Sequence, residues 1–284
     1  MQLLGWVHLI LNFSGLLLWL KWREAMLQSA RRPVGTMLIS TLKRAGGAPA
    51  YRWAYLAGLA GLVFLRAVGY RQMGPAVRWT PFLDLVAVFI PFRSDDFTLM
   101  LLFSLLSLLI FMAEFYFCLL LLSAANRKVS DTDPLQNQIR AHLGWLERWP
   151  SPVKILLPFL VAGLFWLALR PLLATLGLLP PFPMERAFRQ AAFIGLASLL
   201  VWRYLIAGIL LLHLVTSYVY FGKATLWSFI NVTAPNLLKP IRWLPLQFGK
   251  IDLAPLVGSA LVLALGQVLL YLLTPVVGTA RLSR

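Results

Sequence analysis

Six long apolar stretches dominate the hydrophobic pattern of this chain. A helix needs roughly 17–25 mostly apolar residues to cross the hydrocarbon of a bilayer. The stretches that meet this length are residues 3–20, 53–69, 97–122, 155–178, 191–214 and 253–276. A further apolar stretch, 81–92, contains Asp84 and two prolines, so we interpret it as an interfacial or re-entrant segment. The pattern predicts an all-α polytopic membrane protein with about six transmembrane helices.

Three shorter stretches between the apolar runs carry apolar residues at helical spacing, with basic residues on the opposite side. A proline at 33, 134 or 235 precedes each one, as is common where a chain enters a helix. The apolar faces are Val34, Leu38 and Leu42; then Leu135, Ile139, Leu143, Leu146 and Trp149; then Leu237, Ile241, Leu244 and Phe248. In the second stretch Gln136, Asn137, Arg140 and Arg148 take the polar side. Such stretches are typical of helices that lie in the membrane interface. The alternative is a helix packed on its own protein.

The order of helix, amphipathic stretch and helix occurs three times along the chain. Two short sequence matches accompany it: AGLVFL at 60–65 recurs as AGLFWL at 162–167, and SLLIF at 107–111 recurs as SLLVW at 198–202. Self-similarity of this kind indicates tandem units. We therefore predict three helix–amphipathic loop–helix units, at residues 1–90, 91–180 and 181–284.

The composition agrees with a lipid environment. Hydrophobic residues make up 60% of the 284 residues and charged residues only 13%, whereas a soluble domain carries about a quarter charged residues. The net charge of +16 lies in short segments between apolar runs. That distribution favours contact with anionic lipid headgroups over nucleic acid binding.

The distribution of Lys and Arg predicts the orientation. Loops 21–52, 123–154 and 215–252 carry 16 of them, against 7 in 70–96, 179–190 and the tail after 276. Because basic loops stay in the cytoplasm, we expect both termini to be extracytoplasmic.

The last unit carries a signature, APNLLKPIR at 234–242 followed by GKIDLAPLV at 249–257. It resembles the YggT family, also called YlmG, whose pattern is close to PLLRPIRR…GGIDLSPLV. The middle unit is similar to a degraded copy that keeps Pro134, Ile139 and Arg140. Typical family members have one or two such units, so a third copy is a departure.

The resemblance implies a bacterial inner-membrane or plastid membrane protein with no known catalytic activity, and we expect the bacterial inner membrane. Family members have been linked to cell division, to osmotic or potassium homeostasis and to assembly of membrane cytochromes. The motif residues that we expect to contact lipid or a partner are Pro235, Lys239, Pro240, Ile241, Arg242, Gly249, Asp252, Pro255, Pro134, Ile139 and Arg140. Within the signature, Asp252 is placed to cap the last membrane helix, with Pro255 in its first turn.

Polar groups inside the spans are few. Glu114 is the acid within a span and Arg203 the most central base. An intramembrane charge is costly, so we expect these two to form a structural ion pair. A substrate or ion pathway is the alternative. His8 and His213 are interpreted as hydrogen-bonded packing residues, with ligation of haem b as the alternative. Cys118 has no partner for a disulfide within the chain.

No glycine-rich phosphate loop, nucleophile elbow or His-Glu-x-x-His motif occurs in the sequence. We therefore expect a non-catalytic scaffold, assembly or accessory subunit of a larger membrane complex. Its partners would be membrane lipids, including anionic headgroups, and other membrane protein subunits, with no cofactor and no nucleic acid. The alternative is a small-ion transporter or channel linked to osmotic homeostasis.

Overall fold

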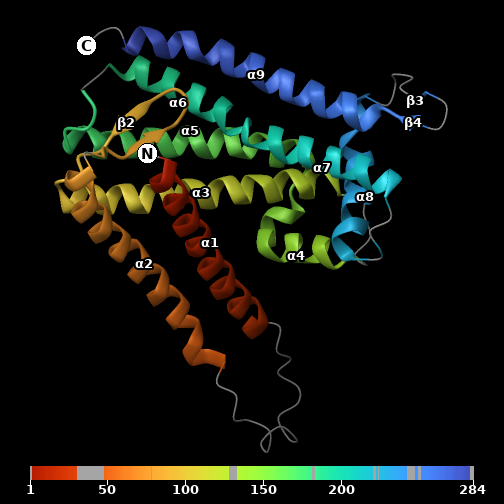
Figure 1. Cartoon of the computed structure of the whole chain (residues 1–284), viewed down its shortest axis with the longest axis horizontal. Helices are drawn as coiled ribbons and strands as arrows, with labels where there is room; N and C mark the ends of the chain where they lie inside the picture. The colour runs from red at the N-terminus through yellow and green to blue at the C-terminus, as the bar shows by residue number, and fades with distance from the viewer. Residues whose placement is uncertain are drawn as a thin grey trace, which may run out of the picture. The chain divides into compact units, whose positions relative to one another are not determined.

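The computed structural model describes residues 2–30, 48–77, 79–127, 133–180, 183–219, 222, 224–241, 247–248 and 251–281. Helices make up most of these residues (Figure 1). The α-helices are α1 (Gln2–Ala30), α2 (Ala48–Val77), α3 (Phe97–Ala125), α4 (Pro134–Leu143), α5 (Ser151–Thr175), α6 (Met184–Ser198), α7 (Val201–Tyr218), α8 (Thr225–Leu237) and α9 (Ala254–Arg281). Two 3-10 helices, η2 (Gly144–Arg148) and η3 (Lys239–Ile241), follow α4 and α8.

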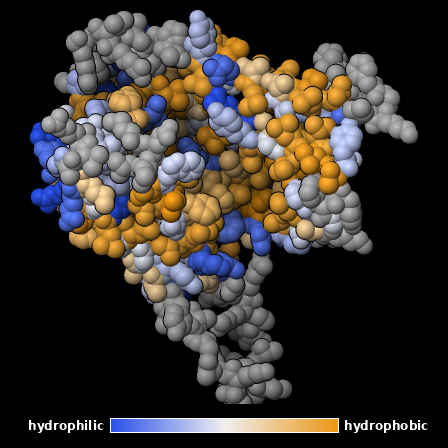
Figure 2. Space-filling view, in the orientation of Figure 1, coloured by the Kyte–Doolittle hydropathy of each residue, from blue (hydrophilic) through white to orange (hydrophobic). Residues whose placement is uncertain are grey.

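The chain is an all-α, multi-pass membrane protein. In its described part, five segments are long and apolar enough to cross a bilayer: Arg52–Pro75, Phe97–Ala125, Ser151–Thr175, Met184–Tyr218 and Ala254–Leu273. Apolar side chains cover much of the face seen in Figure 2, as lipid-facing helices require. The sixth predicted stretch, 3–20, lies within α1, and a count of six spans stays a prediction.

The chain divides into two compact units, and the boundary falls inside α3. Unit 1 is Met1–Leu83 with Pro91–Ala113, and unit 2 is Asp84–Ile90 with Glu114–Arg284. In unit 1, α1 packs against α2. In unit 2, α5 packs against α6, α7 against α8 and α9, and α4 against α8. The threefold division predicted from the sequence stays a prediction.

Glycines allow the helices of unit 2 to approach closely. A Cβ added to Gly195 of α6 would lie 2.7 Å from the backbone oxygen of Phe159 in α5, and one added to Gly163 would lie 3.1 Å from the oxygen of Ala191. On α9, a Cβ at Gly266 would lie 2.7 Å from Cδ of Arg203. Small residues serve the same purpose at helix contacts in membranes, where packing replaces the hydrophobic effect.

The predicted span 191–214 contains a break between α6 and α7. Around it, backbone bonds run three residues back, from Leu199 N to Leu196 O and from Leu200 N to Ala197 O, at 3.1 and 3.0 Å. The Ser198 hydroxyl also donates to the carbonyl of Gly195 at 2.7 Å. Tightening of this kind, with a serine bonded to its own helix, bends a helix without proline.

The stretch 81–92 forms a short hairpin of two strands, β1 (Phe82–Asp84) and β2 (Phe89–Pro91). In its turn, Val86 has a positive φ of 65° and its N–H bonds the Asp84 carboxylate at 2.8 Å. This hydrogen bond explains why a β-branched residue is held in the left-handed region.

One of the three amphipathic predictions is wrong in its position. The last amphipathic helix is α8, which begins at Thr225 and ends at Leu237, so Pro235 lies in its final turn rather than before its start. Phe248, predicted on a helical face, lies in strand β3 (Gln247–Phe248), which pairs antiparallel with β4 (Ile251–Asp252). The first predicted stretch, with Val34, Leu38 and Leu42, lies outside the described residues.

Candidate functional site

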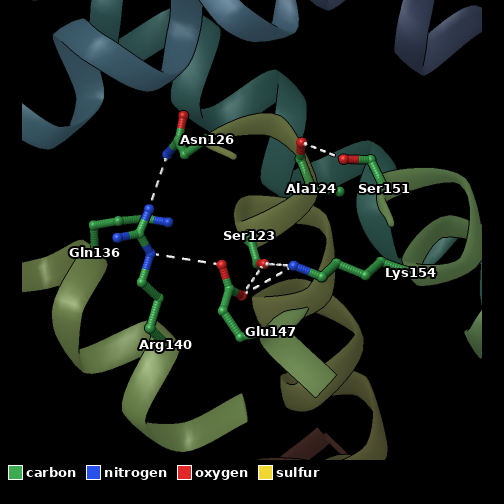
Figure 3. A network of polar contacts seen from close by, with 8 residues as sticks. All are labelled: Ser123, Ala124, Asn126, Gln136, Arg140, Glu147, Ser151 and Lys154. Carbon is green, nitrogen blue, oxygen red and sulfur yellow. Dashed lines mark hydrogen bonds and ion pairs between the residues drawn. The ribbon is translucent and has the colours of Figure 1, made fainter. Parts of the chain in front are cut away.

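A network of polar side chains is buried in unit 2, where the end of α3 meets α4, η2 and the first turn of α5 (Figure 3). Two residues of α8 extend it. Its members are Ser123, Asn126, Gln136, Arg140, Glu147, Ser151, Lys154, Thr233 and Asn236. We call this set the polar network.

Glu147 is the acidic centre of the polar network. Its carboxylate accepts from the Lys154 ammonium at 3.1 Å and from the Ser123 hydroxyl. Arg140 Nε lies 3.5 Å from the other carboxylate oxygen. In this ion pair the Glu147 side chain is 19% exposed to solvent, whereas the Lys154 side chain is 1% exposed. A buried ammonium needs such a partner, because its desolvation is otherwise uncompensated.

Lys154 and Ser123 are in direct contact. The ammonium donates to the Ser123 hydroxyl oxygen at 2.6 Å. Ser123 is fully buried, and its hydroxyl donates a hydrogen bond to the Glu147 carboxylate. Three side chains from α3, η2 and α5 are therefore closed into one ring of hydrogen bonds, as Figure 3 shows.

Asn126 forms the second half of the polar network. Its amide nitrogen donates to Thr233 at 2.8 Å and to Gln136 at 3.5 Å, and its oxygen accepts from Asn236 at 3.0 Å. Thr233 in turn donates to the Phe229 carbonyl at 2.7 Å. Both amide protons and the oxygen of Asn126 are used, so the buried amide is satisfied without water.

Local sequence signals place these side chains. The Asp133 carboxylate caps α4 by accepting from Leu135 N at 2.9 Å, with Pro134 as the first helical residue. Gly144, at a φ of 58°, ends α4 and turns the chain into η2. Pro150 then precedes α5. These closely spaced signals bring Arg140, Glu147 and Lys154 back onto the end of α3.

The motif residues of the middle unit have separate roles. Pro134 starts α4, Ile139 is 7% exposed on its buried face, and Arg140 reaches Glu147. Gln136 was predicted on the polar side but is fully buried. It faces inward because Asn126 lies there to bond it. For α4, the structure thus matches the alternative of a helix packed on its own protein.

The signature of the last unit is partly described. As predicted, the Asp252 carboxylate caps α9, accepting from Ala254 N at 2.9 Å, and Pro255 is the second residue of that helix. Lys239 and Pro240 are exposed in η3. Ile241 packs near Gly258 of α9. Arg242 and Gly249 lie outside the described residues.

The two intramembrane charges do not pair with each other among the described residues. Arg203 Nη2 donates to the Tyr204 hydroxyl at 2.6 Å, and its guanidinium lies 4.4 Å from the centre of the Tyr204 ring. Its stem rests on Gly266. The predicted ion pair with Glu114 is absent there because the neighbouring tyrosine holds the guanidinium.

Both intramembrane histidines have polar partners. His213 Nδ1 lies 2.9 Å from the side-chain oxygen of Asn231. His8 Nδ1 lies 3.0 Å from the Tyr70 hydroxyl and 3.1 Å from Arg66 Nη2. Arg66, which lies within the predicted span 53–69, is buried, with 4% of the residue exposed.

Sequence reasoning missed most of the polar network. Ser123, Asn126 and Lys154 sit at span ends, where polar residues are ordinary, and so they gave no signal. The contacts with α8 could not be predicted from local patterns, because Asn126 bonds residues 107 and 110 positions away in the sequence. Glu147 and Lys154 lie on different elements, η2 and α5, so their spacing along the chain gave no helical signal either.

Comparison with protein-family models, with curated proteins and with solved structures finds no match for this chain.

Proposed function

We propose that this multi-pass membrane protein is a non-catalytic scaffold, assembly or accessory subunit of a larger complex in the bacterial inner membrane. The observation that carries the proposal is that the polar network spends nearly all its polar groups on contacts within the chain. Its charged groups bond one another and Ser123, and its amide groups bond one another and Thr233, with Gln136 Nε2 the buried donor left without a partner among the described residues. These contacts join five elements and fix the geometry of one end of unit 2. A group that binds substrate would instead point its donors into an open space.

The contact of Ser123 with Lys154 deserves comparison with a nucleophile and its base. Nucleophilic catalysis needs a base that can take the hydroxyl proton. Lys154 is an ammonium bonded to Glu147 and donates to the Ser123 oxygen rather than accepting from it. Ser123 is also sealed from solvent. These contacts support a structural role.

Three of the candidate spans leave most of their apolar surface exposed, where another subunit could pack. The apolar windows of α2, α5 and α9 have 17%, 22% and 22% of their residues buried within the chain. Their other side chains face lipid or another subunit. Exposed Lys239 and Pro240 provide a basic corner beside α8, suited to anionic headgroups or an acidic partner surface.

The orientation belongs to the same proposal. All members of the polar network lie in loops 123–154 and 215–252, which the basic residues assign to the cytoplasm. Contact between α4 and α8 supports a common side for these two loops. The resemblance of 234–257 to the YggT family supports an accessory role and the bacterial inner membrane, and membership of that family is part of the proposal.

Purification from native membranes tests the proposed function. A tagged chain, solubilised in mild detergent and cross-linked, should retain a defined membrane protein in fixed stoichiometry. Lys239→Glu should reduce that recovery, whereas Arg189→Glu should not, because Arg189 is an exposed residue of α6 bonded within its own helix to Glu185. Recovery of the folded chain without any stoichiometric partner would contradict the proposal.

The rival function, small-ion transport, is favoured by one observation. A transported ion needs charged or polar groups within the span, and Arg66 is buried in the candidate span Arg52–Pro75. Proteoliposomes loaded with an ion-sensitive dye test this function. Flux that is lost in Arg66→Met but kept in Arg203→Met would favour the transporter.

A further inference from the structure

Arg66 lies at the centre of a buried polar cluster in unit 1. Its guanidinium donates to Asn12 Oδ1 at 2.6 Å, to His8 Nδ1 at 3.1 Å and to the Ser107 hydroxyl oxygen. The centre of the Tyr70 ring lies 5.3 Å from its carbon. These partners come from α1, α2 and α3. We call them, with Arg66, the Arg66 cluster.

The Arg66 cluster holds one positive charge that its described members do not neutralise. Asn12, Ser107 and Tyr70 are neutral acceptors or donors. His8 presents an unprotonated Nδ1 to Arg66, since that nitrogen accepts. No carboxylate contacts the guanidinium in the described part of the chain. A charge in this setting requires a counter-charge, because neither water nor lipid can supply one cheaply.

The guanidinium also has a donor to spare. Arg66 Nε is buried and has no hydrogen-bond partner among the described residues. A guanidinium carries five N–H groups in a fixed fork, so the Nε–H points where an acceptor is missing. The Ser107 hydroxyl accepts from Nη2 and donates to the Ser104 carbonyl at 3.2 Å, and it makes no bond with Nε.

Aromatic rings wall the Arg66 cluster and limit the size of any ligand. The Phe103 ring centre lies 5.3 Å from that of His8 and 5.9 Å from that of Tyr70. Phe103, Tyr70 and Asn12 are all at most 5% exposed. Ring edges carry partial positive charge, and the close packing of these buried side chains favours a single atom over an organic acid.

We propose that the Arg66 cluster is a binding site for a small inorganic anion of the halide class. The anion would accept from the Nε–H of Arg66 and supply the single negative charge that the cluster lacks. This site would exist whether or not the chain assembles with other subunits, so it is independent of the function proposed above.

Anion-dependent stability of the whole chain tests the proposal. Wild-type protein in nanodiscs is heated in sodium gluconate, and chloride or bromide then replaces gluconate at constant ionic strength. The expected result is an upward shift of the unfolding midpoint that saturates with halide concentration, since a ligand that binds only the folded state stabilises it by mass action. Intrinsic tryptophan fluorescence reports the midpoint.

Variants locate the site. Arg66→Met should abolish the halide-dependent shift, and Arg66→Lys should weaken the apparent affinity at least about tenfold, because a lysine lacks the fork. Arg203→Met, which removes an arginine within a span of unit 2, should keep the full shift. A shift that is unchanged in Arg66→Met would overturn the proposal.

If Arg66→Met does not fold, locating the bound bromide in the wild-type chain still tests the proposal. Crystals of the wild-type chain grown in bromide should give an anomalous peak in contact with the Arg66 guanidinium. Absence of that peak at a bromide concentration that saturates the stability shift would overturn the site.

Discussion

The Lys154 ammonium lies 3.1 Å from the Glu147 carboxylate, although the two partners differ widely in burial. Lys154 is 1% exposed at the start of α5 and Glu147 is 19% exposed on η2. The loss of either partner therefore has a different consequence. Without Glu147, a fully buried ammonium keeps only Ser123, whereas without Lys154 a partly wet carboxylate still has Arg140 and Ser123.

We predict that Glu147→Gln destabilises the chain more than Lys154→Met. Breaking a buried pair from one side costs about 3–5 kcal/mol. Glu147→Gln should cost this much because it strands the buried ammonium, and Lys154→Met should cost less because the carboxylate left behind is partly exposed. The double variant should recover part of the loss. Chemical denaturation in detergent measures all three. Glu185→Gln, which breaks the exposed pair with Arg189, is the control and should cost less than about 1 kcal/mol. Equal losses in the two single variants would contradict the asymmetry.

The close approach of α5 and α6 predicts opposite outcomes for two glycines. Gly195→Ala should destabilise unit 2, because the added Cβ would lie 2.7 Å from the Phe159 carbonyl oxygen and the backbones would have to separate. Gly208→Ala in α7 meets nothing within 4 Å. It should be neutral or stabilising by up to about 1 kcal/mol, since alanine is the better helix former. Unfolding midpoints of the two variants decide the matter, and a stable Gly195→Ala would mean that the helices are not in backbone contact.

Glu114 and Arg203 should behave independently. Arg203 is held by Tyr204, so removing Glu114 does not strand it. We expect the effects of Glu114→Gln and Arg203→Met to add within about 0.5 kcal/mol in the double variant, as for sites without shared partners. A double-mutant cycle on unfolding free energy measures the coupling. Clear rescue in the double variant would restore the ion pair inferred from the sequence.

Topology reporters test the orientation. A fusion within 126–133 should report the cytoplasm, and a fusion after residue 276 should report the opposite side. The contact between α4 and α8 adds a second expectation, that a fusion within 219–224 shares the side of the first. If the fusions within 126–133 and 219–224 report opposite sides of the membrane, the result would contradict the contact between α4 and α8.

The apolar runs could be predicted from the sequence because membrane spans are defined by length and hydrophobicity alone. The caps at Asp133 and Asp252 are local as well, so their positions follow from a few neighbouring residues. The start of α8 was misplaced because Pro235 was interpreted as an opening residue. Pro235 instead lies in the final turn, where it removes one backbone hydrogen bond and the helix ends two residues later, at Leu237.

The polar network and the Arg66 cluster depend on tertiary contacts that no local pattern encodes. Gln136 reads as the polar side of an amphipathic helix, and only the presence of Asn126 opposite makes its burial favourable. From the sequence alone, an arginine near the end of a span, such as Arg66, would ordinarily extend to the headgroups. Its burial follows from three acceptors on other helices, at sequence separations of 54, 58 and 41 residues.

The long separation between Asn126 and its partners has a consequence for biogenesis. Thr233 and Asn236 are 107 and 110 residues further along the chain. At a synthesis rate of about 5–20 residues per second, the Asn126 amide waits roughly 5–20 s for them. During this interval water must solvate it, which requires the end of α3 to stay outside the hydrocarbon until α8 has been made. The last third of the chain therefore completes a structure that the first two thirds cannot close, and a ribosome that stalls before α8 would leave an inserted but open protein for quality control to recognise.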